Sequence, residues 1–139
     1  MRIVLILISL MCLAPMVACG EEGGGPDAEN VFQQRTRFYQ LVCTCALPEA
    51  QRTMVVSEGA ACVSDYVGGA ERRNCIVDTV NAQWGELSEE ATCLRAAFEE
   101  AENCVTRPPG CPELGNCVAL ATNAMNACGS GIEAATTDC

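Results

Sequence analysis

The chain has 139 residues and a formal net charge of −10, with eight arginines, no lysine and no histidine. Such an acidic chain lacks the basic patch that nucleic acids and anionic lipid headgroups require, so no nucleic-acid partner is predicted. Without histidine it has no imidazole for a catalytic triad or a zinc site, and no cofactor is predicted. Aromatic residues make up only 4% of the chain, whereas cysteine occurs 12 times. We therefore expect one small domain whose thin core depends on disulfides.

The N-terminal segment has the pattern of a targeting sequence. Arg2 is followed by an apolar stretch from Ile3 to Ala18. This stretch is interrupted by Pro15 and is too short to cross a bilayer as a stable helix. Residues 1–18 are therefore predicted to be a signal peptide that does not belong to the folded domain.

The end of this segment carries a short motif, Met16-Val17-Ala18-Cys19. It resembles the lipobox of bacterial lipoproteins, whose last residue is acylated on sulfur and becomes the mature N-terminus. The resemblance implies that Cys19 is lipidated and that a membrane anchor holds the protein in the bacterial cell envelope. Because Gly20 follows rather than aspartate, it also implies transfer to the outer membrane.

The number of cysteines agrees with this interpretation. Cys12 would leave with the signal peptide and Cys19 would carry lipid, so that an even set remains in the rest of the chain. Ten cysteines can form five disulfides, which requires an oxidising compartment such as the periplasm or the cell surface.

The mature chain is predicted to begin with a tether. This tether covers residues 19–30, which are the lipid-anchored cysteine and the glycine-rich, acidic stretch after it. It shows no apolar periodicity and is expected to be flexible. The cysteine-rich helical domain is then expected over residues 31–139. In its first helix, Phe38 and Val42 share one apolar face, and Pro48 ends the helix.

Two further helices are predicted before the middle of the chain. The first covers about residues 57–67 and ends at Gly68-Gly69, and the second covers residues 70–84 and ends at Gly85. Only the run at residues 53–56 has the composition of an extended segment.

Three more helices are predicted in the C-terminal half. One begins after Ser88 as its N-cap and buries a stripe that reaches Val105. The next begins at Pro112 and ends at Gly129. The last has a capping box over residues 130–133 and runs to the C-terminus. The predicted fold is all-α, a small disulfide-stapled helical bundle built from antiparallel helical hairpins.

The positions of four cysteines predict one such hairpin. Cys93 lies as far before the Gly110-Cys111 junction as Cys128 lies after it, and Cys104 and Cys117 are centred on the same junction. Facing residues in an antiparallel helical hairpin have this symmetry, and the junction lies in a Pro-Pro-Gly turn. We therefore predict the disulfides Cys93–Cys128 and Cys104–Cys117.

A second hairpin is predicted on the same ground, because Cys62 and Cys75 are centred on Gly68-Gly69. A Cys62–Cys75 disulfide leaves four cysteines whose pairing stays open: Cys43, Cys45, Cys111 and Cys139. In a competing scheme, Cys43 and Cys45 bind Cys62 and Cys75. Cys111 then pairs with Cys139. Residues two apart on a helix point ~200° apart, so Cys43 and Cys45 should take different partners.

These observations favour a non-enzymatic cell-envelope lipoprotein that binds a protein partner or stabilises the cell surface. The alternative is a thiol redox or metal-handling lipoprotein that uses the dithiol of Cys43 and Cys45. A lipid-carrying cavity like that of plant lipid-transfer proteins is not predicted, because their adjacent Cys-Cys pair is missing. Six glutamates are close together in the sequence: Glu86, Glu89, Glu90, Glu99, Glu100 and Glu102. We interpret them as a solvated helix face rather than as a cation site.

Overall fold

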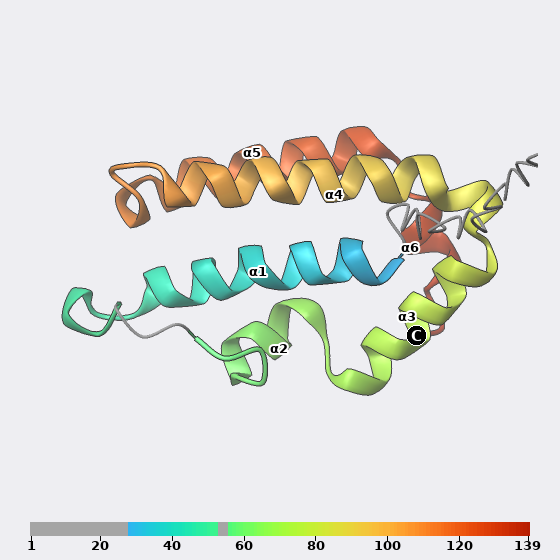
Figure 1. The fold of residues 1–139 in the computed structure, drawn as a ribbon, viewed down its shortest axis with the longest axis horizontal. Coiled ribbons are helices and arrows are strands. Elements are labelled where there is room, and N and C mark those ends of the chain that lie inside the picture. The colour runs from blue at the N-terminus through green and yellow to red at the C-terminus, as the bar shows by residue number, and fades with distance from the viewer. Residues whose placement is uncertain (1–27, 53–55) are drawn as a thin grey trace, which may run out of the picture.

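The computed structural model describes residues 28–52 and 56–139, and the secondary structure within these ranges is helical (Figure 1). The all-α fold class is confirmed. The elements are α1 (Ala28–Ala46), the 3-10 turn η1 (Glu49–Gln51), α2 (Ala61–Val67), α3 (Ala70–Ala82), α4 (Trp84–Thr106), the 3-10 turn η2 (Cys111–Glu113), α5 (Leu114–Cys128) and α6 (Gly131–Ala135).

Helix α1 begins earlier than the sequence predicts. Its first residue, Ala28, is only 1% exposed, and its amide donates a hydrogen bond to the side-chain oxygen of Asn81 on α3 at 3.3 Å. The predicted tether over residues 19–30 is therefore wrong at its C-terminal end, because burial of Ala28 draws the helix start into the domain. The predicted signal peptide, Cys19 and residues 20–27 lie outside the described residues. At the other end, α1 stops before Pro48, as predicted.

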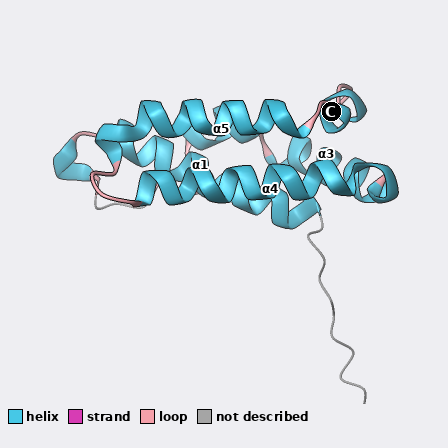
Figure 2. Ribbon diagram, turned by 90° about the horizontal axis from the view of Figure 1, so that it is seen from above, coloured by secondary structure: helices cyan, strands magenta, loops and turns pink. Residues whose placement is uncertain are grey.

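Helices α1 and α4 run parallel to each other, and α5 returns antiparallel to α4 (Figures 1 and 2). The largest core cluster lies between these three helices. Phe38 of α1 packs against Phe98 of α4 with ring centroids 6.0 Å apart, and Ala101 and Cys117 close the contact between α4 and α5. The small side chains of Ala101 and Cys117 are both fully buried, which allows the helices to approach closely.

The connection between the parallel helices contains α2 and α3, which follow each other along α1 (Figure 1). Helix α2 is shorter than the predicted 57–67 and packs on α1 through Val63, which is 0% exposed. It ends at Gly68, whose φ of 81° lies in the left-handed region that favours glycine. A Cβ there would also lie 2.9 Å from Cδ of Arg72. Of the run expected to be extended, residues 53–55 lie outside the described residues.

Helix α4 begins four residues before the predicted N-cap. The predicted helix over residues 70–84 ends at Ala82, and α4 starts at Trp84, so Gly85 lies in its first turn rather than terminating α3. Ser88 lies inside the helix and does not cap it. The additional turn brings Leu87 into a second core cluster with Phe32 and Ile76. Burial of this leucine favours the longer helix over the local capping preference.

Helix α6 is held by a residue distant in sequence. The carboxylate of Glu90 on α4 accepts hydrogen bonds from the amides of Gly131 at 2.8 Å and Ile132 at 3.1 Å. The predicted capping box is wrong, because Ser130 makes no side-chain hydrogen bond as a cap. Glu90 instead satisfies these free amides and places a negative charge at the helix N-terminus.

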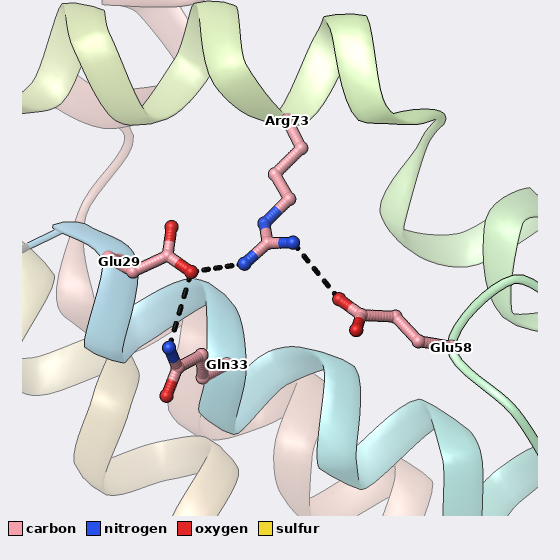
Figure 3. A network of polar contacts seen from close by, with 4 residues as sticks. All are labelled: Glu29, Gln33, Glu58 and Arg73. Carbon is pink, nitrogen blue, oxygen red and sulfur yellow. Dashed lines mark hydrogen bonds and ion pairs between the residues drawn. The ribbon is translucent and has the colours of Figure 1, made fainter.

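Arg73 of α3 links three segments (Figure 3). Its guanidinium forms ion pairs with Glu29 of α1 and with Glu58, which precedes α2, the latter at 3.0 Å. Glu29 also accepts a hydrogen bond from Gln33 at 3.2 Å. Because these side chains are partly exposed, each pair contributes about 1 kcal/mol or less.

Candidate functional site

The ten cysteines of the described residues form five disulfides. Two of the predicted pairs, Cys93–Cys128 and Cys104–Cys117, are present and join α4 to α5; the second belongs to the largest core cluster. Their Cα atoms are 5.5 and 5.6 Å apart, within the usual range for disulfides. The symmetric spacing about the turn therefore identified this hairpin correctly.

The predicted Cys62–Cys75 pair is wrong. Cys62 binds Cys43 on α1, and Cys75 binds Cys139 at the C-terminus. The physical reason is that α2 and α3 each pack along α1 and do not fold back on each other as an antiparallel hairpin. The remaining disulfide joins Cys45 to Cys111, a pair that the competing scheme does not contain. Of the pairs that the competing scheme allows, only Cys43–Cys62 is present.

Cys43 and Cys45 take different partners, as predicted. Their exposed fractions are 2% and 8%, so neither sulfur is readily accessible from solvent. A dithiol at these positions would require reduction of two separate buried disulfides. Within the described residues, no group of three or more cysteine, aspartate or glutamate side chains is placed to hold a metal ion.

The acidic residues of α4 have separate surroundings. Glu99 and Glu100 are exposed, and Glu99 pairs with Arg95 one turn earlier at 3.3 Å. Glu102 accepts a hydrogen bond from Gln34 of α1, while Glu90 binds α6. The run therefore supplies contacts between helices as well as an acidic surface.

A cavity that the sequence did not predict lies among α1, α3, α4, α5 and α6, with a volume of about 410 Å³. Its apolar wall is formed by side chains from four of these helices: Val31, Phe32, Ile76, Leu94, Phe98 and Met125. Exposed residues such as Arg72 and Glu133 also line it, so it reaches the protein surface. Its volume lies within the range typical of small-molecule sites.

Arg35 is the unusual residue of this cavity. Its guanidinium carbon lies 5.8 Å from the ring centroid of Phe32 and 5.9 Å from that of Tyr39. Its Nη2 donates a hydrogen bond to the backbone carbonyl of Tyr66 at 2.6 Å, and the Tyr66 ring stacks on Tyr39 at 4.5 Å. Among the described residues, no carboxylate oxygen lies within 4.0 Å of a guanidinium nitrogen of Arg35, so Arg35 forms no ion pair with them.

Burial lowers the pKa of Arg35 from its ordinary value; Tyr39 opposes this effect and the nearby charge of Arg72 adds to it. The guanidinium nevertheless keeps its charge at neutral pH. Arg72 likewise forms no ion pair among residues 28–52 and 56–139. The cavity is thus lined by two cations that neutralise no carboxylate of the surrounding fold.

The cavity is polarised along its length. Tyr39 and Phe98 mark one end on the parallel helices α1 and α4, and Ala28 and Glu90 mark the other. Arg35 lies towards the first end. Glu90 lies with α6 at the second. Arg35 and the carboxylate of Glu90 therefore line opposite ends.

No protein-family model, curated protein or solved structure matches this chain. None of the helices described here is long and apolar enough to cross a membrane.

Proposed function

We propose that this protein is a non-enzymatic lipoprotein of the bacterial cell envelope, anchored at the outer membrane through Cys19. The supporting observation is the complete pairing of the ten cysteines between Cys43 and Cys139. These disulfides require an oxidising compartment, and they leave only Cys12 and Cys19 of the chain for other roles.

The helical domain then serves as an interaction or structural module at the surface. The whole chain has 18 acidic side chains against eight arginines, so the expected protein partner presents a basic surface. A catalytic role has little support, because the chain has no histidine or lysine and its domain cysteines are oxidised.

Intact mass spectrometry of the protein extracted from bacterial membranes tests the anchor. We expect a chain that begins at Cys19 and carries two or three acyl chains. Replacing Cys19→Ser should abolish acylation and membrane retention. The matched control Cys12→Ser should leave both unchanged, since that residue leaves with the signal peptide. A soluble, unacylated product with a different N-terminus would refute the proposal.

The alternative use of Cys43 and Cys45 in redox chemistry or metal handling is not favoured by their burial in separate disulfides.

A further inference from the structure

The two arginines that line the cavity are unusual in so acidic a chain. Acidic residues outnumber arginines by 18 to eight, yet Arg35 has two aromatic rings, a backbone carbonyl and the charge of Arg72 around it. Arg73, next in sequence to Arg72, instead binds two glutamates. A shortage of carboxylates does not explain the arrangement at Arg35 and Arg72.

A partly buried guanidinium without a counter-ion is unfavourable, because burial removes water without supplying an opposite charge. The rings of Phe32 and Tyr39 offset part of this cost. The carbonyl of Tyr66 accepts a hydrogen bond from only one of the five guanidinium N–H groups. The like charge of Arg72 increases the cost, and an anion bound by both arginines would remove it.

The rest of the cavity fits an alkyl chain. Phe32 and Ile76 continue the apolar wall from Arg35 and Arg72 towards α6, and Leu94 and Met125 line it from α4 and α5. Ala28 and Tyr39, both of which line the cavity, are separated by about 16 Å along α1. The carboxylate of Glu90 disfavours a second anion at the α6 end, so the ligand's headgroup would lie at the arginine end.

We propose that this cavity binds a single-chain amphiphile with an anionic headgroup, held by Arg35 and Arg72, with its alkyl chain against the apolar wall. This activity is independent of the lipid anchor and extends beyond the proposed function. Carboxylate and phosphate headgroups share the required charge, and the experiment distinguishes them.

The test uses the full-length protein reconstituted in phosphatidylcholine vesicles and a dodecanoate probe with a diazirine in its alkyl chain. After irradiation, peptide mapping locates the label, which we expect on cavity-lining residues such as Met125. Dodecanoate and dodecyl phosphate are competitors, and dodecan-1-ol is the uncharged control. At least one anion should compete at a concentration about tenfold lower than the alcohol. The anion that competes at the lower concentration identifies the headgroup.

Substitutions assign the effect to the two arginines. R35M and R72M should each raise the required competitor concentration about tenfold, which corresponds to about 1.4 kcal/mol. R37M is the matched control, because Arg37 is an exposed arginine of the same helix that does not line the cavity. If R35M does not form the native disulfides, R72M decides, since Arg72 is exposed. Label outside the cavity, equal competition by the alcohol, or wild-type competition in R72M would overturn the proposal.

Discussion

The carboxylate of Glu90 on α4 binds the backbone amide of Gly131 at 2.8 Å, so that a residue in one helix caps another helix 41 positions later. The same carboxylate binds the amide of Ile132 at 3.1 Å. This contact holds α6 against the beginning of α4, where Leu87 and Ile132 belong to the same apolar cluster.

Replacing Glu90→Ala should lower the free energy of unfolding by about 1 kcal/mol, the usual effect of losing a helix cap. Urea unfolding followed by circular dichroism would measure the change. Glu89→Ala is the matched control, because Glu89 is exposed and makes no described contact with α6. Equal effects of the two substitutions would show that Glu90 does not cap α6.

Gly131→Ala should also destabilise the protein. A Cβ at this position would lie 2.7 Å from Oε2 of Glu90 and 3.2 Å from Cδ2 of Leu87, so both side chains would have to move. Gly115→Ala is the comparison, because a Cβ there meets nothing within 4 Å and lies in α5. We expect Gly115→Ala to stabilise the protein by about 0.5–1 kcal/mol. A stabilising Gly131→Ala would contradict the observed contact.

Removing a single disulfide should lower the free energy of unfolding more when that disulfide closes a longer loop. Cys104 and Cys117 are 13 residues apart, and Cys45 and Cys111 are 66 apart. From the chain entropy of these loops, replacing both cysteines by alanine should lower the free energy of unfolding by about 3 kcal/mol for the short loop and about 4 kcal/mol for the long one. Each loss should lower the melting temperature by several degrees per kcal/mol. A larger loss for the short loop would show that packing around Cys117, which is fully buried, dominates.

Peptide mapping of the native protein under non-reducing conditions should recover Cys43–Cys62, Cys45–Cys111 and Cys75–Cys139. Iodoacetamide at neutral pH should modify none of these residues before reduction, because no thiolate is present. Reduction in denaturant, which should make all of them reactive, is the control. Alkylation of native Cys43 or Cys45 would instead support the redox alternative.

The sequence predicted well what depends on local spacing. The hairpin of α4 and α5 was predictable because one turn at Gly110 sets which cysteines face each other. The disulfides Cys45–Cys111 and Cys75–Cys139 were not, because they depend on the parallel packing of α1 with α4 and on the position of the C-terminus.

The start of α4 and the cavity were missed for a related reason. Tertiary burial of Leu87 extends the helix past the cap expected at Ser88. Phe32 and Tyr39 lie three and four residues from Arg35 on α1, so helical spacing alone places both rings beside its charge. The carbonyl of Tyr66 and the charge of Arg72 come from other segments and reach Arg35 only when the helices are assembled.

The disulfides also determine what happens when the backbone is cut. The spans of Cys43–Cys62, Cys45–Cys111 and Cys75–Cys139 overlap, so every peptide bond from Cys43 to Cys139 lies within at least one of them. A protease that hydrolyses a single bond in this region therefore produces two chains that remain covalently joined. The nicked molecule would migrate as one species on a non-reducing gel, and its fragments would separate only after reduction.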